Sequence, residues 1–173
     1  MNRRTALQAL LLASGGLATL PSWAMRWRPT DLAGTASVFS STEHQLLAAV
    51  ADTILPAGDE IGALSVGVDQ FLPKLFSQCY DADVQASLKT QLRALDTAAR
   101  QAHGVAFPAC SQTQRETLLN RLAASADEEE KAFFDLMKSE TMRGFTTSEE
   151  VMVKYLGYRV IPTYYHGCVD VNS

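Results

Sequence analysis

A chain of 173 residues, 47% hydrophobic and 20% charged, has enough apolar material for one folded domain with its own core. Its 15 basic and 19 acidic residues give a net charge of −4 without a basic cluster, which argues against nucleic-acid binding. GxGxxG, GxxxxGK[ST], CxxC and CxxCH are absent, so we expect no nucleotide-binding loop and no attached c-type haem in this chain.

The first 24 residues, MNRRTALQALLLASGGLATLPSWA, have the features of an export signal. Arg3 and Arg4 are their only charged side chains, and a short apolar run containing Ser and Gly follows. This run is too weakly apolar for a membrane-spanning helix, which needs ~20 predominantly apolar residues. Ser22 and Ala24 place small residues at positions −3 and −1 of a cleavage site after Ala24.

The adjacent arginines favour the twin-arginine route, which exports folded proteins. Leu7 fits that type of signal, whereas Ala6 and Gln8 replace its preferred Phe and Lys. An ordinary secretory signal, an uncleaved anchor and, least favoured, a cytoplasmic helix are the alternatives. Cleavage would leave 149 residues, and because the leader contains two of the basic residues and no acidic one, the mature net charge would be −6.

The mature chain is predicted to consist of a linker, residues 25–39, and one helical domain, residues 40–173. The linker, beginning MRWRPTDLAGTAS, shows no sustained hydrophobic period, whereas apolar residues recur at helical spacing from residue 40 onward.

The first two predicted helices flank a glycine-rich loop. Ser40 and Glu43 form a capping box that begins the first helix. Pro56 ends that helix and opens the loop PAGDEIGALS. The second helix has an apolar stripe over residues 68–79, and Pro73 either kinks it or marks the start of its regular part.

Four further helices are predicted from their end signals. Asp81 is the N-cap of the third and longest helix, and Ser111 is the N-cap of the fourth. The fifth begins in ADEEEK, because acidic residues suit the positive end of the helix dipole, and Gly144 closes it. Thr147 and Glu150 form another capping box before a short sixth helix.

No convincing alternating strand pattern and no internal repeat occurs in the sequence. We therefore expect an all-α fold, a compact bundle of five or six helices around one core. From residue 157 onward the sequence GYRVIPTYYHGCVDVNS predicts an irregular aromatic tail.

Candidate catalytic or metal-binding side chains are few and scattered. The histidines lack a second ligand at metal-binding spacing, which favours surface or capping roles; they are His44, His103 and His166. The carboxylates around the first loop are expected to be solvated or turn-forming, or to contact a partner, and would form an acid–base pair only if the fold brought two of them together; they are Asp52, Asp59, Glu60 and Asp69. The run at 127–130 is explained by a helix N-terminus. Cys110 has no nearby His to activate it. We expect no catalytic, cofactor-binding or metal-binding residue.

Tyrosine is concentrated near the C-terminus, where four of the five tyrosines lie within eleven residues. These are Tyr155, Tyr158, Tyr164 and Tyr165, followed directly by His166. The apolar ring and polar hydroxyl of Tyr suit a contact surface. Two interpretations are open: the tail packs on its own domain, or it binds a protein partner. The residues alone thus indicate an exported helical protein with a binding or structural role.

Short motifs follow one another along nearly the whole mature chain: ILPAGD at 54–59, CYDAD at 79–83, GFTTSE at 144–149 and LGYRVIPTYYHGC at 156–168. In this order they resemble the gluconate 2-dehydrogenase subunit 3 family, the small subunits of periplasmic FAD-dependent sugar and polyol dehydrogenases. The individual motifs are short, and the tail block carries most of the specificity.

The resemblance implies a non-catalytic small subunit in the periplasm, where any association with the membrane would be made through its complex. It also implies a partner that carries FAD and catalysis, with a c-type cytochrome often added. Such a flavoprotein often lacks its own signal, so this chain is expected to carry it through the twin-arginine translocase as a folded passenger. The alternatives are a free-standing periplasmic helical binding or chaperone-like protein and, least favoured, an enzyme that depends on His166 or Asp59.

The resemblance further suggests how the cysteines pair. Cys79 and Cys168 fall in family-like motifs, whereas Cys110, in FPAC, does not. We therefore expect a Cys79–Cys168 disulfide, which leaves Cys110 free.

Overall fold

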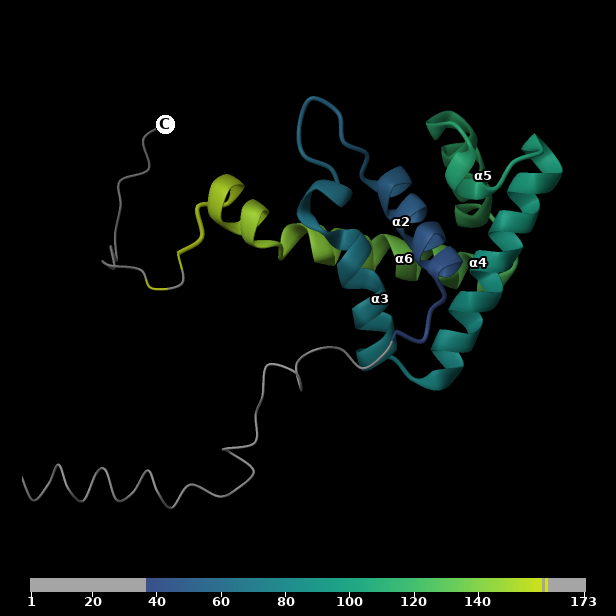
Figure 1. The fold of residues 1–173 in the computed structure, drawn as a ribbon, viewed down its shortest axis with the longest axis horizontal. Coiled ribbons are helices and arrows are strands. Elements are labelled where there is room, and N and C mark those ends of the chain that lie inside the picture. Colours follow the sequence, from purple (N-terminus) through teal and green to yellow (C-terminus); the bar gives the residue numbers. More distant parts are fainter. Residues whose placement is uncertain (1–36, 160, 162–173) are drawn as a thin grey trace, which may run out of the picture. The chain divides into compact units, whose positions relative to one another are not determined.

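The structure, a computed structural model, describes residues 37–159 and residue 161. These residues form five α-helices, two 3₁₀-helices and one π-helical turn without any strand, which confirms the all-α prediction (Figure 1). The α-helices are α2 (Ser41–Ile54), α3 (Val68–Cys79), α4 (Ala82–His103), α5 (Gln112–Ala123) and α6 (Glu128–Thr146). The shorter elements are η1 (Leu64–Val66), η2 (Phe107–Ala109) and the π-helical η3 (Val151–Tyr155). The predicted signal, with Arg3, Arg4 and Ala24, lies outside the described residues, as does most of the predicted linker.

Helix α2 is the centre of the bundle, because it packs against α3, α4, α5 and α6. Its face toward the other helices contains Leu47, Val50 and Ala51, all of them fully buried. Apolar side chains from the surrounding helices complete the core, among them Leu72, Phe76, Leu88, Leu92, Leu119 and Met137. The apolar stripes of the sequence therefore meet around one helix, as the 3.6-residue period predicts.

The helix ends follow the predicted caps at most positions. Ser40 accepts a hydrogen bond from the Glu43 amide, and Glu43 accepts one from the Ser40 amide, so the capping box is confirmed. Ser111 caps α5 in the same way, together with Gln114. Helix α3 begins at Val68 and contains Pro73, so the proline does not mark its start.

Gly144 does not close the fifth predicted helix. It lies inside α6, which continues to Thr146. A Cβ atom built on Gly144 would lie 2.6 Å from Cδ1 of Phe71 in α3. The glycine is therefore required by the close packing of α6 against α3, and the prediction that it stops the helix is wrong.

The predicted capping box of Thr147 and Glu150 is not formed either. The Thr147 hydroxyl donates to the carbonyl of Arg143, and the Glu150 carboxylate pairs with Lys154. Ser148 takes the capping role, since its Oγ accepts from the Val151 amide at 3.4 Å. The element that follows is η3, a π-helical turn closed by the Leu156 amide on the Val151 carbonyl.

Candidate protein-binding face

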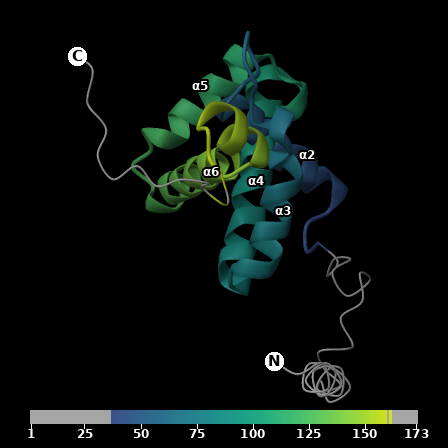
Figure 2. The same cartoon turned by 90° about the vertical axis from the view of Figure 1, so that its left-hand side faces the viewer.

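One end of the bundle is formed by two segments that lie far apart in the sequence. The first is the loop between α2 and α3, residues 56–66, and the second is the arm after α6, residues 148–159 and 161. Figure 2, which views the molecule from this end, shows η3 crossing in front of α6 and beside the loop. We call the surface that these two segments share the loop–arm face.

The loop has a defined conformation because backbone groups close it at both ends. The Ala63 amide donates to the Leu55 carbonyl at 2.9 Å, and the Val68 amide donates to the Ala63 carbonyl at 3.2 Å. Gly62 packs so tightly against the backbone of Ala57 that a Cβ atom would not fit. The glycine-rich sequence thus folds back on itself and presents its tip, with Asp59 and Glu60, to solvent.

The arm is anchored by the buried side chain of Val151; Ser148, Glu150 and Met152 are partly buried, and its other described residues are exposed. Val151 is buried, whereas Leu156 is 64% and Ile161 is 83% exposed. Backbone hydrogen bonds shape the arm: the Leu156 amide donates to the Val151 carbonyl, and the Tyr158 amide donates to the Met152 carbonyl at 2.8 Å. The arm therefore has a regular backbone but leaves large apolar side chains in water.

A side-chain hydrogen bond connects the two segments. The hydroxyl of Tyr155 donates to Oε2 of Glu60 at 3.0 Å. This bond to a carboxylate, with a smaller contribution from partial desolvation, raises the pKa of Tyr155, since an ionised phenolate could not donate it. Tyr155 is therefore neutral and able to donate at physiological pH.

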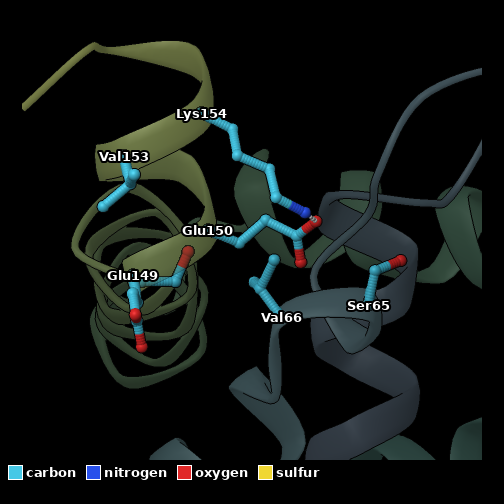
Figure 3. Close-up of a pocket in the computed structure, with 7 residues that line it drawn as sticks. Ser65, Val66, Glu149, Glu150, Val153 and Lys154 are labelled. Carbon is cyan, nitrogen blue, oxygen red and sulfur yellow. Dashed lines mark hydrogen bonds and ion pairs between the residues drawn. The ribbon is translucent and has the colours of Figure 1, made fainter.

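Between loop and arm lies an open hollow of about 450 Å³ (Figure 3). Its lining comes from both segments and consists of Ser65, Val66, Ser148, Glu149, Glu150, Val153 and Lys154. The Lys154 ammonium and Oε1 of Glu150 form an ion pair at 2.7 Å, which raises the pKa of Lys154. Figure 3 shows both of these side chains reaching toward the side where Ser65 and Val66 lie.

Exposed apolar side chains lie on the two segments that line this hollow. Leu64 on the loop and Val153, Tyr155, Leu156, Tyr158 and Ile161 on the arm are all exposed large hydrophobic residues. In the described part of the chain, only Val38, Val105 and Met142 belong to the same class elsewhere. A concentration of this kind at one end of a small domain is typical of a protein-binding surface.

The predicted interface residues fall partly on this face. Tyr155 and Tyr158 are exposed on the arm, as a partner-binding role requires. Tyr164, Tyr165 and His166 lie outside the described residues, as does Cys168. Their proposed roles therefore stay predictions.

Sequence reasoning missed the apolar contributions of Leu64, Val153 and Leu156. The signal available for the last two was their position next to the tyrosine cluster, since Val153 lies shortly before Tyr155 and Leu156 lies between Tyr155 and Tyr158. Leu64 carried no such signal, because nothing in its local sequence shows that the loop folds back beside the arm.

Several of the candidate acid–base and metal-binding groups form contacts that are separate from one another. Asp52 forms an ion pair with Arg115 at 2.9 Å, and the ring of His44 is 2.8 Å from the hydroxyl of Ser37. Asp127 caps α6 by accepting from the amides of Glu129 and Glu130, as its position predicts. Among the described residues no group of three potential metal ligands comes together.

Cys79 is exposed and Cys110 is buried, and the two are not joined to each other. The predicted Cys79–Cys168 pair cannot be followed within the described residues, because only its first member is among them. Cys110 Sγ lies 3.6 Å from the carbonyl of Ala106, a contact available to a buried thiol. Helices long and apolar enough to cross a membrane do not occur in the part that the structure describes.

The structure is an all-α bundle that exposes a group of apolar side chains at one end. These features define a class of small helical domains suited to binding another protein. The family model of Gluconate 2-dehydrogenase subunit 3 matches residues 41–162, and the chain belongs to this family. The family recognition made from the sequence motifs is therefore confirmed, and the chain is of the kind that serves as a subunit of a dehydrogenase complex. No curated protein and no solved structure matches it.

Proposed function

We propose that this chain is a non-catalytic small subunit that binds the FAD-dependent catalytic subunit of a sugar or polyol dehydrogenase through the loop–arm face. The observation that carries this proposal is the set of exposed apolar side chains on two segments joined by Tyr155 and Glu60. Covering such side chains is favourable by about 25 cal/mol for each Å² of apolar surface removed from water. Family membership supplies the class of complex.

An accessory role is supported by the placement of the candidate reactive groups. Asp52 is paired with Arg115 and Glu60 with Tyr155, so neither is arranged with a second carboxylate as an acid–base pair. In the proposed division of labour, the partner binds FAD and oxidises the substrate. A c-type cytochrome is a further proposed partner, which would accept the electrons.

The proposal includes export. The flavoprotein has to fold around FAD before it crosses the membrane, and a twin-arginine signal exports folded proteins. Arg3 and Arg4 at the start of this chain supply the motif that the translocase would read. The small subunit would then carry the catalytic subunit into the periplasm as a passenger.

The experiment that tests the proposal is purification of the tagged full-length protein from its native periplasm, with an absorbance spectrum of the eluate. A flavin spectrum together with a large co-eluting chain supports the proposal. A colourless eluate with a single chain contradicts it and favours a free-standing binding or chaperone-like protein. Substrate turnover by the single chain, lost on changing His166 or Asp59, would identify an enzyme instead.

The export step is tested separately with the variant Arg3→Lys/Arg4→Lys. Lysine keeps the positive charge but removes the twin-arginine motif. The flavoprotein should then stay in the cytoplasm together with the small subunit. Its arrival in the periplasm despite the substitution would contradict the passenger role and leave the subunit assignment intact.

A further inference from the structure

We propose that the loop–arm face recognises a positively charged segment of its partner, one in which arginine or lysine side chains flank an apolar side chain. This inference rests on the proposed function, because it specifies what the catalytic subunit presents to the face. It adds the chemistry of recognition, which neither the fold nor the family membership supplies.

The face is acidic as well as apolar. Four carboxylates lie on it, two on each segment: Asp59, Glu60, Glu149 and Glu150. Two cations, Lys154 and Arg159, lie on the arm, and Lys154 is already paired with Glu150 at 2.7 Å. The two segments of the face therefore combine an excess of negative charge with exposed apolar side chains.

These carboxylates have unused hydrogen-bonding capacity. Glu60 accepts from Tyr155 through Oε2, and Glu150 accepts from Lys154 through Oε1, which leaves one oxygen of each without a partner in the described residues. Asp59 and Glu149 have no hydrogen-bond or ion-pair partner within the same part of the chain.

Binding of a partner to the loop–arm face changes the hydration of these carboxylates. A partner that covers Leu64, Leu156 and Tyr158 also removes water from the neighbouring carboxylates. Desolvation of an ionised carboxylate is costly unless a positive group replaces the water. A surface that supplies cations at these positions therefore covers the apolar side chains more favourably than a surface without them.

The geometry favours basic side chains over a metal ion as the source of that charge. Figure 3 shows the side chains of Glu149 and Glu150 pointing in different directions from the same turn, so they do not converge on one point. No cluster of three potential metal ligands occurs in the residues that the structure describes. Guanidinium groups suit separate carboxylates, because each binds one carboxylate through its planar array of donors.

The test compares two doubly substituted variants of the full-length tagged chain, each co-expressed with the flavoprotein that copurifies with it. Glu60→Gln/Glu149→Gln removes one charge from each segment of the face, and the glutamine introduced on the loop retains an oxygen that can accept from Tyr155. The matched control, Glu116→Gln/Asp135→Asn, makes the same charge change at exposed positions of α5 and of the middle of α6. The readout is the dissociation constant of the complex at about 50 and about 500 mM NaCl, a range over which screening increases strongly.

We expect the face variant to bind on the order of tenfold more weakly than wild type at low salt, and the control to bind like wild type. High salt should weaken the wild-type complex and largely remove the difference between the proteins. Equal binding by the face variant and wild type, or equal weakening by the control, would overturn the inference while the complex itself still supports the proposed function. Absence of any flavoprotein with the wild-type chain would instead overturn the proposed function and this inference with it.

Discussion

The hydroxyl of Tyr155 donates a hydrogen bond to Glu60 at 3.0 Å, although the two residues are 95 positions apart in the sequence. Tyr155 belongs to η3 in the arm, and Glu60 lies at the tip of the loop between α2 and α3. The arm has only one buried side chain in η3, Val151, so this bond is a second point of attachment. The hydrogen bond between Tyr155 and Glu60 therefore joins the loop and the arm into one surface.

Replacing Tyr155 with Phe should loosen the arm without unfolding the domain. The substitution removes the hydroxyl donor to Glu60 but keeps the aromatic ring, and both groups are exposed. Amide hydrogen exchange at Leu156 and Tyr158, whose amides close the arm, should become several-fold faster. The thermal unfolding midpoint should stay unchanged. Tyr158→Phe is the matched control, and unchanged exchange in Tyr155→Phe would show that the bond does not hold the arm.

Leu156→Asp should weaken flavoprotein binding while leaving the subunit folded. Leu156 is 64% exposed, so its replacement should change the free energy of unfolding by no more than about 0.5 kcal/mol. A charge among the apolar side chains of the face should weaken the complex at least about tenfold, as the loss of a central contact does. Val105→Asp, at an exposed apolar position between α4 and η2, is the control. Equal copurification by both variants would place the interface elsewhere.

The sequence predicted the bundle well because its signals are local. The capping residues Ser40 and Ser111 and the helical spacing of apolar side chains each depend on a few neighbouring residues. Even the position of Asp127 at the start of α6 follows from the preference of acidic side chains for the helix N-terminus. Local rules of this kind suffice to place most helix ends.

The prediction errors occurred at positions whose structure depends on contacts with residues far away in the sequence. Gly144 was expected to end a helix, but Phe71 from another helix occupies the space where its side chain would be. The contact surface was predicted only in part. The tyrosine cluster indicated the arm, but the contribution of Leu64 depends on the loop lying beside the arm. The residues next to Gly144 and Leu64 in the sequence do not indicate either of these distant contacts.

Gly144→Ala should destabilise the protein, although alanine normally favours a helix over glycine by about 1 kcal/mol. The new Cβ would lie 2.6 Å from the ring of Phe71, which therefore has to move. We expect a loss of about 1–3 kcal/mol in the free energy of unfolding, typical of overpacking. Urea denaturation provides the measurement. In a Phe71→Ala background the same substitution should be neutral or stabilising, and an equal loss in both backgrounds would show that the ring is not the cause.

Stability should depend on pH through Glu43. Burial alone would raise the pKa of Glu43, but hydrogen bonds from Ser40 and Arg93 outweigh it and hold the pKa below its ordinary value of 4.5. The carboxylate therefore stabilises the fold above about pH 4.5, and this contribution is lost as the pH falls through the lower, folded-state pKa. Glu43→Gln should cost about 1–2 kcal/mol at pH 7 and little in strong acid.

Urea denaturation midpoints of wild type and Glu43→Gln at neutral and acidic pH measure this dependence. Glutamine still supports a capping box, so the comparison isolates the charge. The exposed control Asp135→Asn should show no comparable change with pH. A constant difference between wild type and Glu43→Gln across the whole range would contradict the assignment to Glu43.

The expected Cys79–Cys168 disulfide would hold the C-terminal tail against the end of α3. Cys79 is exposed and can form a bridge, whereas Cys110 is buried in the core. A bridge that closes so long a stretch of chain stabilises by about 2–4 kcal/mol. Peptide mapping without reduction should therefore find Cys79 linked to Cys168, and Cys79→Ser should lower the unfolding midpoint only under oxidising conditions. Cys110→Ser is the control for loss of a thiol, and a mapped bridge that contains Cys110 would refute the pairing.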